Sequence, residues 1–186
     1  SLANLTNLTG LGLSGNPLTA VALPIIQGLE AGGTTVLHDP LPDPAVVNIP
    51  DDNLRAKLEG ALGKGVGDAM TDAELAGLSG PLDASDSNIS DLTGLEYCTN
   101  LTELWLRDNQ IIDVSVLSNL TNLTSLRLFD NEISDISVLA SLTNLTSLYL
   151  SSNQINDISP LANLTKLTSL YLSFNQISDI SPLSNL

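Results

Sequence analysis

Four aspartates recur every 22 residues in the second half of the chain: Asp113, Asp135, Asp157 and Asp179. A ladder of carboxylates could bind calcium, which takes oxygen ligands. Each of these aspartates, however, stands two residues before a serine, where its side chain can accept hydrogen bonds from the backbone N–H groups of a tight turn. Neither an EF-hand pattern nor a glycine–aspartate calcium repeat accompanies them. The pattern therefore predicts turn capping and not a metal site.

The single cysteine and the single histidine offer little for catalysis or zinc binding. Cys98 lies 22 residues before Leu120, in a column of core leucines, and is predicted to be a small buried hydrophobe. His38 has no cluster of cysteines or histidines near it, which argues against zinc and against a Ser–His–Asp arrangement. Since no acid/base pair or phosphate-binding loop stands out either, the chain is predicted not to be an enzyme and to need no cofactor.

The 22-residue period extends to the apolar residues and defines the architecture. Each unit reads L-T-x-L-x-L-x-x-N-x-I-x-D-[IV]-S-x-L, beginning at Leu101, Leu123, Leu145 and Leu167. The alternating leucines predict a short strand, and the residues after the asparagine predict a turn that returns along the opposite side. The expected fold is a leucine-rich-repeat solenoid of α/β type with a right-handed curve. Parallel strands would line its concave face, and short turns or 3-10 segments its convex face.

An asparagine at the end of each strand is predicted to point inward, where its amide can bond backbone groups of the adjacent turns. The positions of this structural ladder are Asn16, Asn109, Asn131, Asn153 and Asn175. A degenerate first repeat precedes the regular ones, because Leu82 falls 22 residues before Leu104 while Ser87 takes the place of the asparagine.

Side chains between the inward-facing leucines are expected on the concave face, and the period assigns them to columns. The columns are Trp105, Arg127, Tyr149 and Tyr171; Arg107, Phe129, Ser151 and Ser173; and Asp108, Asp130, Ser152 and Phe174. Five of the six aromatic residues and two of the three arginines thus fall on one surface. Such a surface is typical of a protein-binding hot spot, with simple strand propensity or sugar stacking as alternatives. The predicted partner-binding residues are Trp105, Arg107, Arg127, Phe129, Tyr149, Tyr171 and Phe174.

Charge and hydropathy exclude other classes of partner. The chain has 6 Lys and Arg residues against 21 Asp and Glu residues, a formal net charge of −15. This charge repels phosphate backbones and anionic lipid headgroups, so we expect neither nucleic acid binding nor direct membrane insertion. No stretch approaches the roughly 18 consecutive apolar residues of a membrane helix. Ser1 opens the chain without a signal-peptide pattern, which predicts an excerpt or a processed product.

Four parts are predicted along the chain. Residues 1–40 restate the repeat and then favour a helix over 21–31 and a strand over 34–37, which indicates the closing repeat and end of an upstream leucine-rich-repeat domain. Residues 41–50 form a proline-rich connector, and residues 51–80 a small helical cap whose second helix opens with a capping box at Thr71. Residues 81–186 form the solenoid, continuing or open at its C-terminal end.

The repeat motif, together with the preceding segment Ile49-Pro-Asp-Asp-Asn-Leu-Arg, resembles the internalin-type leucine-rich-repeat proteins of bacterial surfaces. The resemblance is close over residues 82–186. Residues 1–40 resemble the closing repeat of a similar domain, and the cap matches more weakly. The resemblance implies an extracellular or cell-surface location and binding of proteins through the concave sheet, often within longer multidomain proteins. It does not identify the ligand.

The leading hypothesis is therefore a non-catalytic, extracellular protein-binding or adhesion module. The alternative is a structural subunit or tandem segment of an extracellular filament, in which copies join through open solenoid ends. Leu2-Ala-Asn-Leu5 matches Leu183-Ser-Asn-Leu186 in register, so the end of one copy resembles the interior of another. A second alternative is carbohydrate binding on the aromatic concave face, with a surface glycan as ligand.

Overall fold

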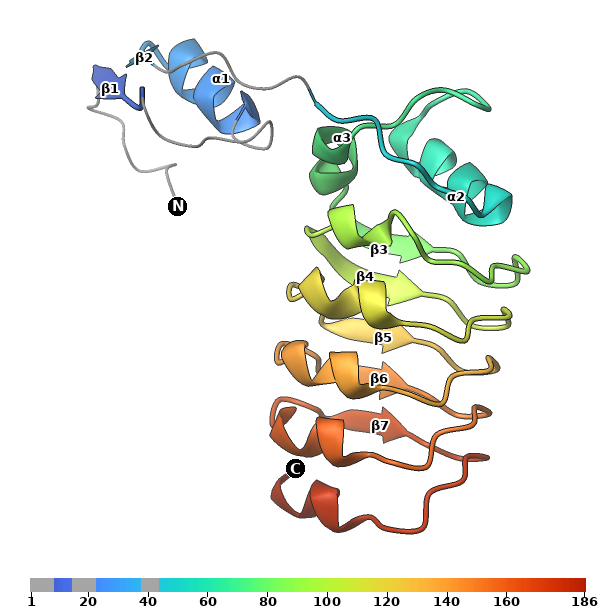
Figure 1. Cartoon of the computed structure of the whole chain (residues 1–186). Coiled ribbons are helices and arrows are strands. Elements are labelled where there is room, and N and C mark those ends of the chain that lie inside the picture. The colour runs from blue at the N-terminus through green and yellow to red at the C-terminus, as the bar shows by residue number, and fades with distance from the viewer. Residues whose placement is uncertain (1–8, 15–22, 38–43) are drawn as a thin grey trace.

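The computed structural model of the chain describes residues 9–14, 23–37 and 44–186 (Figure 1). The ladder position Asn16, His38 and the chain start that the filament hypothesis invokes lie outside these residues. So do residues 41–43 of the predicted connector. The predicted boundaries of the four parts stay a prediction.

The repeats build one parallel five-stranded sheet in which each strand pairs with the strand of the next repeat. The strands follow one another in the order β3-β4-β5-β6-β7. Their bounds are β3 Gly80–Asp83, β4 Leu101–Trp105, β5 Ser125–Arg127, β6 Ser147–Tyr149 and β7 Ser169–Tyr171. Leu104 pairs with Leu126, Leu126 with Leu148, and Leu148 with Leu170, so the register advances by one 22-residue repeat per strand.

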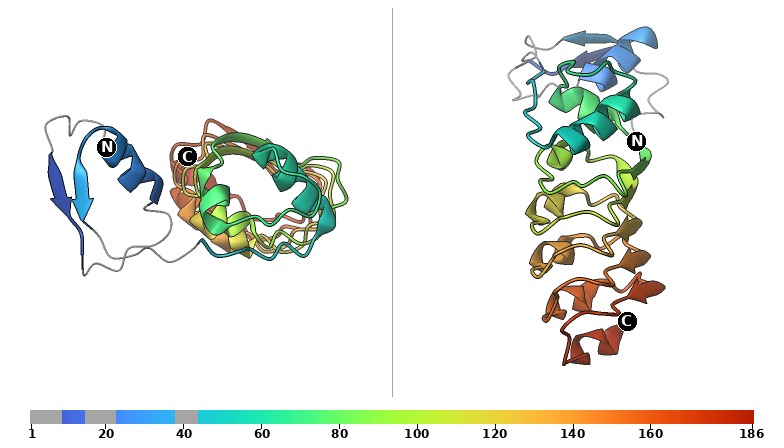
Figure 2. Two further views of the ribbon diagram at one scale, coloured as in Figure 1. Left: turned by 90° about the horizontal axis from the view of Figure 1, so that it is seen from above. Right: turned by 90° about the vertical axis from the view of Figure 1, so that its right-hand side faces the viewer.

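Short 3-10 helices carry each coil back along the side opposite the sheet. They are η3 Leu95–Tyr97, η4 Ser115–Asn119, η5 Ser137–Ser141, η6 Ser159–Asn163 and η7 Ser181–Asn185. Figure 2 shows the coils superposed as a closed loop in one view, and the strands and 3-10 helices on opposite edges in the other. The predicted leucine-rich-repeat solenoid, with strands on the concave face and short 3-10 turns on the convex face, is confirmed.

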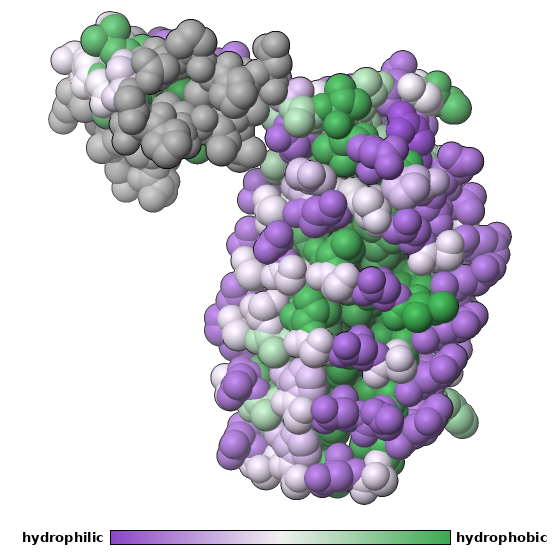
Figure 3. All heavy atoms as spheres, in the orientation of Figure 1, coloured by the Kyte–Doolittle hydropathy of each residue, from purple (hydrophilic) through white to green (hydrophobic). Residues whose placement is uncertain are grey.

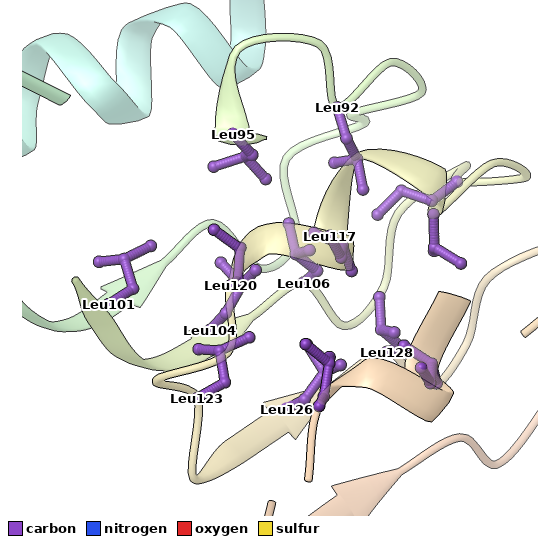
Figure 4. Close-up of a cluster of buried hydrophobic side chains, with 14 of the residues drawn as sticks. Leu92, Leu95, Leu101, Leu104, Leu106, Leu117, Leu120, Leu123, Leu126 and Leu128 are labelled. Atoms are coloured by element: carbon purple, nitrogen blue, oxygen red, sulfur yellow. The ribbon is translucent and has the colours of Figure 1, made fainter. Parts of the chain in front are cut away.

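The core lies inside the coils and consists mainly of leucines stacked from repeat to repeat (Figure 4). Leu104, Leu126 and Leu148 are all 0% exposed. Burying such a side chain stabilises the fold by about 1.5–3 kcal/mol, and the neighbouring coil supplies much of the contact. In the last repeat the equivalent Leu170 is only partly buried. Each repeat therefore depends on its neighbours for burial.

Two helices cover the upstream end of this core. The helix α2 spans Asp52–Leu62 and α3 spans Asp72–Gly77. Leu54, Leu58 and Leu75 are fully buried in the same cluster as the repeat leucines. Thr71 and Glu74 form the capping box that the sequence predicts for α3.

Asp51 joins this cap to the first repeat. Its Oδ1 accepts hydrogen bonds from the backbone N–H groups of Asn53 and Leu54, both at 3.0 Å, and caps α2. Its Oδ2 accepts from the N–H groups of Ser90 at 2.9 Å and Asp91 at 3.2 Å. Burial by itself raises the pKa of Asp51, but these four backbone hydrogen bonds together hold that pKa below its ordinary value.

The N-terminal part contains two strands and a helix. The strands β1 Gly10–Gly12 and β2 Thr35–Leu37 pair in parallel, and α1 spans Leu23–Ala31. Ile26 and Val36 are buried there. The predicted helix and closing strand are confirmed over these bounds. Their assignment to an upstream domain stays a prediction.

The side that carries the 3-10 helices is mostly hydrophilic at its margins, with a hydrophobic strip along the middle (Figure 3). Among the residues that the structure describes, no helix is both long enough and apolar enough to cross a membrane.

Candidate functional site: a stacked column on the concave face

The ladder asparagines fix the end of each strand and so position the residues before them. The Nδ2 group of Asn131 donates to the carbonyl oxygens of Leu106 at 2.9 Å and Leu128 at 3.1 Å, and its Oδ1 accepts from the N–H of Ile111 at 3.0 Å. Asn153 makes the equivalent contacts one repeat later. Each side chain thus ties its own coil to the preceding one. This arrangement holds the concave columns in register.

The residue before each ladder position has a left-handed backbone. Its φ lies between 50° and 57° in every repeat, at Asp86, Asp108, Asp130, Ser152 and Phe174. Aspartate and serine are short polar residues, and aspartate in particular tolerates this conformation. Phe174 does not fit that rule, because a bulky side chain with positive φ is strained. The residue is also 84% exposed. The sequence pattern placed Phe174 on this face but gave no sign of the strain.

The first predicted column is a continuous stack of planar groups, which we call the central stack: Trp105, Arg127, Tyr149 and Tyr171. The guanidinium carbon of Arg127 lies 4.5 Å from the ring centroid of Trp105 and 5.4 Å from that of Tyr149. The rings of Tyr149 and Tyr171 are stacked, with centroids 4.8 Å apart and an interplanar angle of 6°. That centroid separation matches the spacing of adjacent strands, about 4.8 Å, so the sheet itself sets the stack. Cation–π and aromatic contacts of this kind each contribute about 0.5–1.5 kcal/mol.

The second column is an ion-paired patch beside the central stack. Arg107 donates to Asp86 at 2.7 Å and to Asp108 at 2.8 Å. Its guanidinium carbon also lies 5.9 Å from the centroid of Phe129. Both carboxylates belong to the left-handed positions, so the same backbone geometry that ends the strands supplies partners for this arginine.

The predicted partner-binding residues differ in exposure. Trp105, Arg107, Arg127, Phe129 and Tyr149 are half-buried, because each is covered by a neighbour in its column or beside it. Tyr171 is 51% and Phe174 84% exposed. Tyr97, the sixth aromatic residue, is 39% exposed and belongs to η3, away from the strands. The structure therefore gathers the column residues that the spacing assigned. Their role in binding stays a prediction.

The aspartates of the convex side cap turns. The Oδ1 atom of Asp113 accepts a hydrogen bond from the N–H of Ser115 at 2.8 Å, and the other three repeats have the same bond at the same length. This bond lowers the pKa of Asp135 and of Asp179. The predicted turn capping is confirmed. In the part of the chain that the structure describes, no three His, Cys, Asp or Glu side chains are grouped to hold a metal ion.

Cys98 lies in the core as its column predicts. It is 0% exposed, and burial, together with the charge of Glu96, raises the pKa of its thiol to about 12. A thiol with that pKa carries almost no thiolate at neutral pH and is a poor nucleophile.

Comparison with known proteins places these repeats in a family. The model of the family "Leucine Rich repeats (2 copies)" matches residues 99–141, 121–163 and 143–185. The crystal structure of the internalin InlF from Listeria monocytogenes is 46% identical, with a TM-score of 0.72, over 76% of this chain and 43% of that one. The internalin InlC2 of the same organism is 28% identical, with a TM-score of 0.43, over 80% of this chain and 96% of that one. No curated protein matches the chain.

The chain thus spans less than half the length of InlF, the more similar of these two structures. The family match falls on the repeats whose strands, turns and asparagine ladder are described above. The chain is a bacterial internalin-like leucine-rich-repeat protein.

Proposed function

We propose that this chain is a non-catalytic protein-binding module that works outside the cell or at its surface and binds its partner through the concave face of the solenoid. The observation that supports this most is the central stack, in which two tyrosines, a tryptophan and an arginine are packed against one another across four strands. Tyrosine, tryptophan and arginine are the residues most enriched in binding hot spots.

Preorganisation makes the central stack suited to binding. Fixing a flexible side chain at an interface costs about 0.5–1.5 kcal/mol of binding free energy. Here the ring of Tyr149 is held between Arg127 and Tyr171, and Trp105 is held by Arg127 on one face. Much of that ordering is therefore already present in the free protein. The edges of the rings stay accessible because the residues are only half-buried.

The same stacking favours a protein partner over a glycan. A sugar ring stacks on the open face of an aromatic side chain, whereas both faces of Tyr149 and one face of Trp105 are covered within the column. A protein surface can pack against the exposed ring edges. The net charge of −15 further favours a partner whose surface is neutral or basic, because an acidic protein would be repelled at long range.

The test is capture of a surface-protein partner by the wild-type chain and by a double variant, Trp105→Ala with Tyr149→Ala. Captured proteins would be identified by mass spectrometry, purified and titrated against each chain by calorimetry. We expect the double variant to bind at least roughly tenfold more weakly, because hot-spot truncations typically exceed 1 kcal/mol each.

The matched control is Tyr97→Ala, which removes a tyrosine ring outside the concave face. Circular dichroism would show that the variants stay folded, since loss of the stacked rings should cost about 1 kcal/mol of stability each. Equal affinity of wild type and double variant, or equal loss with Tyr97→Ala, would refute binding through the concave face.

A further inference from the structure

Among the described residues, Arg127 differs from the other two arginines in having no acidic partner. Arg55 pairs with Glu59 at 2.9 Å, and Arg107 with Asp86 at 2.7 Å and Asp108 at 2.8 Å. The side chain of Arg127 makes no ion pair or hydrogen bond with any residue of the described ranges, and its Nε atom is buried without a hydrogen-bond partner. Buried polar atoms are nearly always satisfied, so the unpaired Nε marks Arg127 as an exception in this fold. The lack of a carboxylate partner is the more notable in a chain with 21 acidic residues.

The central stack fixes the position of the Arg127 guanidinium but offers it no hydrogen-bond acceptor. The rings of Trp105 and Tyr149 hold the plane of the guanidinium from both sides. Aromatic faces attract the cation but do not accept the directed hydrogen bonds that its five N–H groups can donate. The terminal nitrogens Nη1 and Nη2 also lack hydrogen-bond partners among the described residues. Of the three guanidinium nitrogens only Nε is enclosed, so the edge formed by Nη1 and Nη2 reaches solvent.

Two carboxylates near the stack are already engaged. Glu103, one strand away, accepts a hydrogen bond from the indole Nε1 of Trp105 at 3.3 Å, and Asp108 is paired with Arg107. Arg127 is thus a positive charge that is fixed in orientation, half-buried and free on its outer edge.

We propose that Arg127 is the specificity-determining residue of the concave face and takes one carboxylate of the partner, the side chain of an aspartate or glutamate. This inference rests on the proposed function and names the chemistry that the site selects. A planar guanidinium with a free edge donates two parallel hydrogen bonds to a carboxylate, and a charge-assisted pair of this kind is about twice as strong as a neutral hydrogen bond. The negative charge of the rest of the chain confines this selection to an isolated acidic residue on an otherwise neutral or basic surface.

The first experiment needs no partner. The Nε–Hε signals of the three arginines in the ¹⁵N-labelled 186-residue chain would be followed during titration with sodium acetate, with sodium chloride at equal ionic strength and acetamide as controls. Arg127→Met assigns the Arg127 signal by its disappearance. We expect acetate alone to shift the Arg127 signal in a saturable way, and the paired Arg107 signal to shift much less. A response equal to that of chloride or acetamide would overturn the proposal.

The second experiment uses the partner found by capture. Arg127→Met keeps the apolar stem of the side chain but removes the charge, and should weaken partner binding roughly tenfold or more. Lys166→Met is the matched control, because it removes an exposed positive charge that lies outside the concave columns. Replacing the acidic residues of the partner one at a time should identify one whose loss has no further effect on the Arg127→Met variant. Additive losses for every acidic residue would overturn the proposal.

The proposed function and this inference can fail separately. If the double variant Trp105→Ala with Tyr149→Ala still captures the partner, the concave-face function is refuted, while the acetate titration still reports on Arg127.

Discussion

The concave and convex faces of the solenoid are built on the same coils but use their residues differently. On the convex face every regular repeat has the same aspartate with the same 2.8 Å hydrogen bond to the serine two positions on. On the concave face the equivalent positions change from repeat to repeat, as in the central stack. The backbone register is identical on both faces, so backbone geometry does not explain the difference.

The repeats therefore act as internal controls for one another. A residue that returns in each repeat with the same hydrogen bonds meets a requirement of the coil, as the ladder asparagines do. A residue that varies while its backbone stays constant is free of that requirement. The varied positions of the concave face are for this reason the better candidates for function. Substituting a repeated residue should mainly lower the stability of the fold, whereas substituting a varied residue of the concave face should mainly weaken partner binding.

The largest effect is expected for a repeated residue, in the variant Asn153→Ala. Asn153 is 8% exposed and bonds the carbonyls of Leu128 and Leu150 and the N–H of Ile133. Removing the amide leaves the N–H of Ile133 without a partner. It also takes one of two asparagine donors from each carbonyl, since Asn131 still donates to Leu128 and Asn175 to Leu150. We expect the free energy of unfolding to fall by about 2–3 kcal/mol. Urea denaturation measures this loss.

The control is Gln154→Ala, which changes the exposed neighbouring residue and should stay within about 0.5 kcal/mol of wild type. Equal stability of the two variants would break the distinction between repeated and varied residues.

A smaller effect is expected at Asp51, which serves the cap and the first repeat only. Asp51→Ala removes the N-cap of α2 and the acceptor for Ser90 and Asp91, so it should destabilise the chain by about 1–2 kcal/mol at neutral pH. The lowered pKa means that the folded state favours the carboxylate. The stabilisation is thus fully present above the ordinary aspartate pKa and is lost as the pH falls through the lowered one.

The check is urea denaturation of wild type and Asp51→Ala between pH 7 and pH 2. The difference between the two chains should be constant at neutral pH and shrink below about pH 4. Asp51→Asn keeps one acceptor oxygen and should lie between the two. A difference that grows on acidification would contradict the assigned hydrogen bonds.

Much of this architecture could be predicted from the sequence because one period sets several properties at once. The spacing of Leu104, Leu126 and Leu148 gives the strand register, and the same arithmetic places Cys98 in the core and Trp105 above Arg127. The capping box at Thr71 was predictable because its signal is local.

Other features depend on contacts between segments that the pattern does not link. The bonds from Asp51 to Ser90 and Asp91 join residues about 40 positions apart with no repeat in common. The pairing of Arg107 with two aspartates, and the lack of an acidic partner for Arg127 among the described residues, depend on side-chain placement that the period does not set. The left-handed backbone before each ladder asparagine was also missed, although the run of aspartate and serine at that position is a signal for it.

The smallest expected effect concerns Phe174, where a varied residue conflicts with the backbone. Its φ of 57° is strained for a bulky side chain, and its 84% exposure means that little packing would be lost on replacement. Phe174→Asn introduces a residue that accepts the left-handed region, and should therefore stabilise the chain by about 1 kcal/mol. Ser152→Asn is the matched control at the same position of the preceding repeat, where the native residue is already small and polar, so it should change stability by less than about 0.5 kcal/mol.

Under the proposed function, the same Phe174→Asn change should weaken partner binding, because the exposed ring is removed from the concave face. Thermal denaturation and calorimetry on one preparation would measure both quantities. A gain in stability with no change in affinity would remove Phe174 from the binding surface, and a loss of stability would show that the ring packs in a way that its exposure does not indicate.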